Sequence, residues 1–272
     1  MTSVFFLRCI SGIVYVFLLL SAVWLSIESA LVFWFIITSM ALYEMQQLLY
    51  KTGKGLRFMI TPYILQLLCT GVSFFDLYAH HNFTYLSGIS LFLYVIIIVL
   101  HYATAKTLTY LMQVIVFQAY AILSFLIAGL FLAQNFNINK SFIIFIMLCI
   151  WSSDSLAYVC GSLFGRHKMA PSISPGKTWE GSIGALVLTL LWVYGISYGF
   201  KSELWYADRI ALAFFIVVFS VLGDLLESKL KRLAHVKDSG NIMPGHGGVL
   251  DRMDSFMAVM PIAWIFLHFF NL

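Results

Sequence analysis

Residues 223–255 read GDLLESKLKRLAHVKDSGNIMPGHGGVLDRMDS, and apolar runs flank this stretch on both sides. The stretch contains four Asp, one Glu, three Lys and two Arg, although only 10% of the chain is charged. It also holds two His, five Gly and one Pro. Ionisable groups at this density between membrane-like segments indicate a polar site at a bilayer surface. We expect the rest of the chain to support that site.

The composition predicts a polytopic membrane protein. The chain has 272 residues, of which 61% are hydrophobic, and its mean hydropathy is +0.93. A soluble domain is about half apolar and about a quarter charged, so that class is excluded. The net charge of +4 is mild, and we expect membrane lipids rather than nucleic acid as partners.

Nine apolar segments can be drawn along the chain, and none shows period-2 alternation. Backbone groups in lipid have to be hydrogen-bonded within their own segment, so we predict an all-α fold with about nine transmembrane helices. The first segment is long enough to span and lacks a cleavage pattern, so we expect it to be retained. The segments are about 9–27, 30–49, 58–76, 83–105, 107–133, 141–164, 181–200, 208–226 and 254–271.

The distribution of cations predicts the topology. With the N-terminus inside and nine alternating spans, thirteen of the sixteen Lys and Arg fall on the cytoplasmic side. This asymmetry follows the positive-inside rule, and it places loops 165–180 and 227–253 in the cytoplasm and the C-terminus outside. The expected location is the inner, or cytoplasmic, membrane. Glu44 and the cations at 51–57 are expected to form an interfacial anchor.

No repeat or linker divides the chain, so we predict one membrane domain over 1–272. Within it, about 1–135 would form N-terminal helices. The catalytic helices and their cytoplasmic loops would occupy about 140–272.

Asp154 interrupts an otherwise apolar helix. A carboxylate there costs roughly 2.5–3.5 kcal/mol on insertion scales, so we expect it to face a polar cavity, either as part of a site or as a structural partner of a Lys. The following loop carries Ser174, Lys177 and Thr178 on a predicted rigid Pro-Gly turn. Lys and hydroxyl groups near a helix N-terminus suit phosphate binding, although a plain basic cytosolic loop has the same composition.

The helix that begins near 208 has to continue past Asp224 to span the bilayer. Asp224, Glu227, Ser228 and Lys231 then share one helical face, which fits a metal–phosphate site or a surface ion-pair stripe. A Gly-rich basic loop follows, in which His246 either binds phosphate or braces the loop.

Asp251 and Asp254 are three residues apart at the start of the last predicted helix and share a face too. Facing carboxylates on two helices form an oxygen-ligand set, which Mg²⁺ takes together with phosphates. The residues therefore predict a membrane enzyme for metal-assisted phosphoryl chemistry on a lipid, with its site at the cytoplasmic surface.

Three motifs resemble those of the phosphatidate cytidylyltransferase (CDP-diacylglycerol synthase) family. They are DSLAYVCG at 154–161, SPGKTWEG at 174–181 and SKLKRLAHVKDSGNIMPGHGGVLDRMD at 228–254. Met243 stands where Leu, Ile or Phe is expected, which is a mild change. The resemblance is specific over about 140–260, and it implies phospholipid biosynthesis: phosphatidic acid and CTP give CDP-diacylglycerol and pyrophosphate with Mg²⁺.

The resemblance also implies roles for matching residues. Asp224 and Asp251 would be the principal metal ligands, and Asp254, Asp154 and Glu227 would be secondary. Lys177 and Lys231 would act in catalysis. The substrates' phosphates would also be engaged by Ser174, Arg232, Lys237 and Arg252. Thr178 and His246 are substrate-binding candidates from the residues themselves.

The family further suggests a homodimer and is compatible with a second, monovalent cation. Two alternatives remain: another CTP-using lipid enzyme such as a polyprenol kinase, and, from a different class, an ion-coupled transporter.

Overall fold

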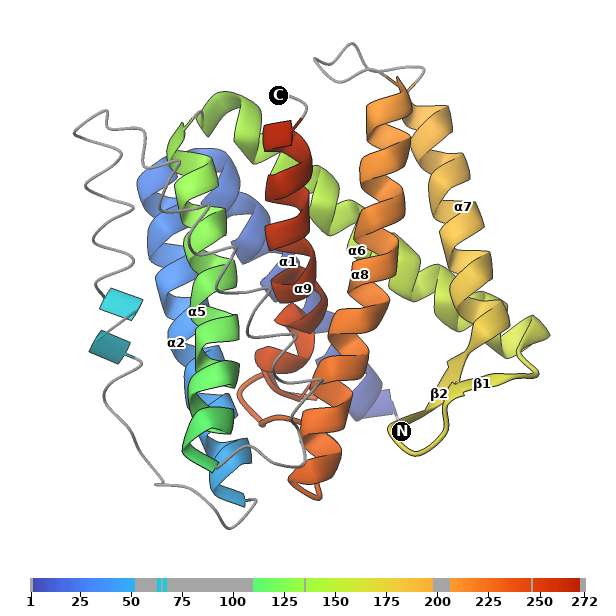
Figure 1. The fold of residues 1–272 in the computed structure, drawn as a ribbon, viewed down its shortest axis with the longest axis horizontal. Helices are drawn as coiled ribbons and strands as arrows, with labels where there is room; N and C mark the ends of the chain where they lie inside the picture. Colours follow the sequence, from blue (N-terminus) through green and yellow to red (C-terminus); the bar gives the residue numbers. More distant parts are fainter. Residues whose placement is uncertain are drawn as a thin grey trace. The chain divides into compact units, whose positions relative to one another are not determined.

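The computed structural model describes residues 2–51, 63–64, 66–67, 110–134, 136–197, 206–245 and 247–269 (Figure 1). This part of the chain is mostly helical, as predicted, with one small β-hairpin. In chain order its elements are α1 (Thr2–Leu25), α2 (Ile27–Lys51), α5 (Tyr110–Gln134), α6 (Phe136–Phe164), β1 (Lys168–Ala170), β2 (Ser174–Thr178), α7 (Trp179–Ser197), α8 (Tyr206–Leu233) and α9 (Leu250–Phe269).

Four of the described helices are long and apolar enough to cross a membrane, in agreement with the predicted protein class. These spans are Ile27–Leu48, Asn139–Phe164, Trp179–Ser197 and Asp208–Leu233. Each overlaps a predicted apolar segment. Predicted segments 58–76 and 83–105 lie almost wholly outside the described residues, so the count of nine and the orientation of the termini stay predictions.

The chain divides into two compact units. One comprises Met1–Ser141 and Leu230–Met253, and the other comprises Phe142–Lys229 and Asp254–Leu272. Helices α8 and α9 each have residues in both units. That the whole chain forms a single membrane domain stays a prediction.

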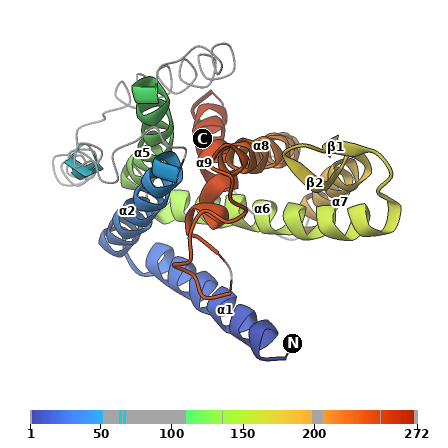
Figure 2. The ribbon, with the colours of Figure 1, turned by 90° about the horizontal axis from the view of Figure 1, so that it is seen from below.

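In the first unit, α2 packs against α1 and α5, and α2 and α5 lie side by side in both views (Figures 1 and 2). Ser26 separates α1 from α2 because its hydroxyl accepts the N–H of Ser29 at 3.2 Å, which caps the new helix. Apolar packing joins α2 to α5, with the rings of Trp34 and Phe125 centred 5.8 Å apart.

In the second unit, the hairpin leads directly into α7 (Figure 2). Thr178 ends β2 and caps α7, since its hydroxyl accepts the N–H of Gly181 at 3.2 Å. Gly161 on α6 lies against this junction, where a Cβ would be 3.2 Å from Thr178 Oγ1. Small residues therefore let α6 approach the start of α7 closely.

The hairpin corrects the prediction for loop 165–180. Strands β1 and β2 are antiparallel, with Lys168 opposite Thr178 and Ala170 opposite Ser174. The chain reverses at 171–173, so Pro175-Gly176 lies within β2 rather than at the turn. A two-stranded sheet consists only of edge strands, where Pro is tolerated because no ladder donor is needed.

Candidate active site

Three carboxylates of the second unit converge: those of Asp224, Glu227 and Asp254. One oxygen from each lies within 4.8 Å of the others. Asp224 and Glu227 share a face of α8 because they are three residues apart. Gly223 allows the close approach of Asp254, since a Cβ there would lie 2.7 Å from the Asp254 carbonyl oxygen and 2.7 Å from Ala258 Cβ.

Because this carboxylate cluster is largely buried, it favours binding of a cation that neutralises its charge. Glu227 is 5% exposed and Asp254 is 8% exposed. Like charges at such short range, in a partly desolvated setting, disfavour one another unless positive charge or protons neutralise them. Three carboxylate oxygens are the hard donor set that Mg²⁺ accepts while it keeps positions for water and phosphate. The residues therefore fit a Mg²⁺ site.

Lys177 brings positive charge to the same cluster from β2. Its Nζ lies 2.6 Å from Oδ2 of Asp224, with both side chains partly exposed. The hydroxyl of Ser228, one turn further along α8, donates to the other oxygen of Asp224 at 3.1 Å. Lys177 of β2 thus meets the face of α8 that carries Asp224, within the second unit.

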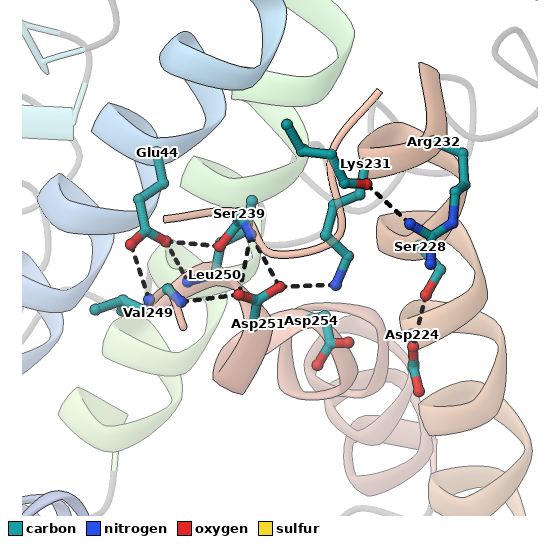
Figure 3. A network of polar contacts seen from close by, with 12 residues as sticks. Glu44, Asp224, Ser228, Lys231, Arg232, Ser239, Val249, Leu250, Asp251 and Asp254 are labelled. Atoms are coloured by element: carbon teal, nitrogen blue, oxygen red, sulfur yellow. Dashed lines mark hydrogen bonds and ion pairs between the residues drawn. The ribbon is translucent and has the colours of Figure 1, made fainter. Parts of the chain in front are cut away.

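Asp251 belongs to a polar network of the first unit (Figure 3). Its Oδ1 accepts from Lys231 Nζ at 2.7 Å, and the two side chains are 8% and 12% exposed, respectively. Its carboxylate also accepts the backbone N–H of Ser239, at 3.0 Å to Oδ2, and that of Gly248 at 2.8 Å. Asp251 therefore orients a lysine and two points of the loop between α8 and α9.

Glu44 of α2 is the second carboxylate of that network, and the sequence did not predict this. It is 1% exposed. It accepts the N–H of Val249 at 3.0 Å, the N–H of Leu250 at 2.8 Å and the hydroxyl of Ser239 at 3.0 Å. The predicted interfacial anchor is wrong for Glu44, because its carboxylate faces this loop within the first unit. An ionisable residue two turns inside an apolar helix was the available signal.

The remaining predicted residues take varied positions. Asp154 is exposed on α6 and is not a member of the three-carboxylate cluster. Ser174 is half-buried at the start of β2. Thr178 is 4% exposed and serves as the cap of α7, so its hydroxyl faces the protein.

The predicted phosphate-binding cations of the loop and its borders are exposed. Arg232 lies in the last turn of α8 and donates to the carbonyl of Val236 at 2.9 Å. Lys237 lies in the loop and Arg252 in the first turn of α9, both with exposed side chains. His246 lies outside the described residues.

Comparison with known proteins gives consistent results over most of the chain. A model of the cytidylyltransferase family matches residues 6–270. The phosphatidate cytidylyltransferase of Bacillus subtilis strain 168 is 34% identical over 239 residues, which is 86% of each chain. The protein of the same name from Haemophilus influenzae is 44% identical over 132 residues, 47% of this chain and 46% of that one. Its namesake from Staphylococcus saprophyticus is 43% identical over 143 residues, 52% and 54% of the two chains.

Proposed function

Because the chain belongs to the cytidylyltransferase family, we propose that it transfers the cytidylyl group of CTP to phosphatidic acid. The products are CDP-diacylglycerol and pyrophosphate, which makes the reaction a step of phospholipid biosynthesis. The names of the three relatives support this substrate pair. The apolar helices support a substrate that resides in the membrane.

The observation that carries the proposal is the cluster of Asp224, Glu227 and Asp254 beside Lys177. These three carboxylates would hold Mg²⁺, which when bound supplies positive charge to the oxygens of the nucleotide triphosphate. Lys177 adds an ammonium group at the edge of the same cluster. Both features suit a reaction in which negative charge builds up on phosphate oxygens.

In the proposed reaction, an oxygen of the lipid phosphate attacks the α-phosphorus of CTP, and the bond from that phosphorus to the bridging oxygen of the β-phosphate breaks. Pyrophosphate leaves with the electron pair. A phosphomonoester loses its second proton near pH 6, by analogy with phosphorylated side chains, so no dedicated base is required. The chain's task is to hold the two anions in line and to neutralise their charge.

The cations that would neutralise the phosphates lie at different positions in the structure. Lys177 lies beside the carboxylate cluster, whereas Lys231 is oriented by Asp251. Arg232, Lys237 and Arg252 have exposed side chains, which suits contact with phosphate groups at the surface, and Ser174 would add a hydroxyl donor. We assign to Asp251 the main role of orienting Lys231, ahead of a role as metal ligand, because its carboxylate already accepts three hydrogen bonds.

The membrane arrangement follows from the charge distribution. We propose nine spans with a cytoplasmic N-terminus, because this arrangement places thirteen of sixteen cations inside. The reaction then takes place at the cytoplasmic surface, where CTP is available. A homodimer remains part of the proposal through the family resemblance.

A labelling experiment tests the function. Purified protein is given phosphatidic acid, Mg²⁺ and CTP labelled at either the α- or the γ-phosphorus. Cytidylyl transfer puts the α-label into lipid and the γ-label into pyrophosphate. A polyprenol kinase would put the γ-label into an added polyprenol, and a transporter would label no lipid, so either of those results contradicts the proposal. The assay also compares Asp224→Asn, which alters the carboxylate cluster, with Asp208→Asn, a control substitution elsewhere on α8.

A further inference from the structure

We propose that Glu44 is a positioning residue for the reaction: it holds the segment formed by residues 239–245 and 247–250 and thereby orients Asp251 and Lys231. The inference rests on the proposed function. It concerns a residue of α2, well before the motifs that carry the family resemblance. Every contact that supports it lies within the first unit.

The hydrogen bonds of Glu44 show how the segment is held (Figure 3). Its two oxygens accept the backbone N–H of Val249, which immediately precedes α9, that of Leu250, the first residue of α9, and the Ser239 hydroxyl. N–H groups at the start of a helix have no partner within the helix, and a carboxylate is the strongest acceptor they can find. Glu44 therefore caps α9 from a different helix.

Ser239 connects this cap to Asp251. Its hydroxyl donates to Glu44 at 3.0 Å, while its backbone N–H donates to Asp251 at 3.0 Å. Asp251 in turn accepts Lys231 Nζ at 2.7 Å. A shift of Glu44 is thus passed through one residue to the carboxylate that orients the lysine.

Three glycines show that this arrangement leaves little freedom. A Cβ at Gly240 would collide with the Glu44 carboxylate, and a Cβ at Gly248 would collide with both that carboxylate and the Ser239 hydroxyl. Gly247 has a φ of +91°, which favours glycine. The backbone approaches the buried carboxylate as closely as residues without side chains allow.

Burial excludes a direct role for Glu44 in binding substrate. At 1% exposure it offers no surface to CTP or lipid. Its loss should therefore lower kcat through misplaced Asp251 and Lys231, and leave KM nearly unchanged. Misplacement by about 1 Å can cost about 100-fold in rate.

The experiment compares Glu44→Gln and Glu44→Ala with wild-type protein. Gln keeps the length but retains one acceptor oxygen, whereas Ala removes all three hydrogen bonds. We expect kcat to fall about tenfold in Glu44→Gln and about 100-fold in Glu44→Ala, with KM for both substrates within about twofold. Glu28→Gln, exposed on the same helix, should match wild type. All values are normalised to folded protein, measured by thermal unfolding.

Hydrogen exchange supplies a readout independent of catalysis. Backbone N–H groups of residues 239–245 and 247–250 should exchange up to about tenfold faster in Glu44→Gln than in Glu28→Gln. Equal exchange in both variants would overturn the holding role. If wild-type protein labels lipid and Glu44→Gln has the same kcat, the positioning role fails alone. If wild-type protein labels no lipid, the proposed function fails, and the exchange data still decide whether Glu44 holds the segment.

Discussion

Lys177 Nζ lies 2.6 Å from Asp224 Oδ2, which joins the end of the β-hairpin to the middle of α8. The two residues are separated by 47 positions in the sequence, and both belong to the second unit. The pair places one cation beside three clustered carboxylates. These carboxylates would hold the metal ion, and the Lys177 ammonium group beside them would add positive charge next to the substrate phosphates.

Lys177→Met should therefore remove a positive charge from the reacting phosphates and leave the hairpin intact. We expect kcat/KM for CTP to fall about 100-fold, the usual cost of losing one preorganised electrostatic group. The labelled-lipid assay measures the loss. Lys168→Met on the exposed face of β1 is the matched control, and an equal loss in both variants would contradict a specific role for Lys177.

Asp224→Asn, Glu227→Gln and Asp254→Asn should each weaken metal binding. Each variant removes one charged oxygen donor from the cluster, so the Mg²⁺ concentration for half-maximal activity should rise at least tenfold. Binding of Mn²⁺, followed by electron paramagnetic resonance, checks affinity without turnover. Chelator should abolish activity in wild-type protein, and Mg²⁺ should restore it. Unaltered Mn²⁺ affinity in all three variants would rule out the cluster as the metal site.

Asp251→Asn should mainly lower kcat, whereas Asp254→Asn should mainly lower metal affinity. Asp251 orients Lys231 and the loop, so its amide variant should lose kcat by about 100-fold and keep most of its Mn²⁺ affinity. Asp254 lies in the carboxylate cluster, so its variant should lose affinity first. If Asp251→Asn weakens Mn²⁺ binding as much as Asp254→Asn does, the sequence prediction of Asp251 as a principal ligand is correct and our assignment is wrong.

The sequence predicted those parts of the site that depend on local spacing. The helical face from Asp224 to Lys231 and the Asp251/Asp254 pair follow from a period of 3.6 residues, and α8 and α9 form there. Helix positions were also predictable, since apolar length determines what can span a bilayer.

The sequence did not predict contacts between distant residues. Glu44 meets its partners 195 to 206 positions away, and its proximity to the cations at 51–57 favoured a simpler explanation. Pro175-Gly176 is typical of a turn, yet pairing across β1 and β2 places it within a strand. In both cases tertiary contacts determined an outcome that local preference could not.

Gly248→Ala tests the tightness of the segment around Glu44 by adding a single methyl group. That carbon would collide with the Ser239 hydroxyl and the Glu44 carboxylate, and such overpacking costs about 1–3 kcal/mol. We expect a lower thermal unfolding midpoint and a kcat reduced about tenfold or more, because the displaced segment carries the donors to Asp251. Gly176→Ala is the control, since a Cβ there meets nothing within 4 Å. Wild-type kcat in Gly248→Ala would mean that the segment can move away from Glu44 without disturbing Asp251, and the positional link between the two carboxylates would then be refuted.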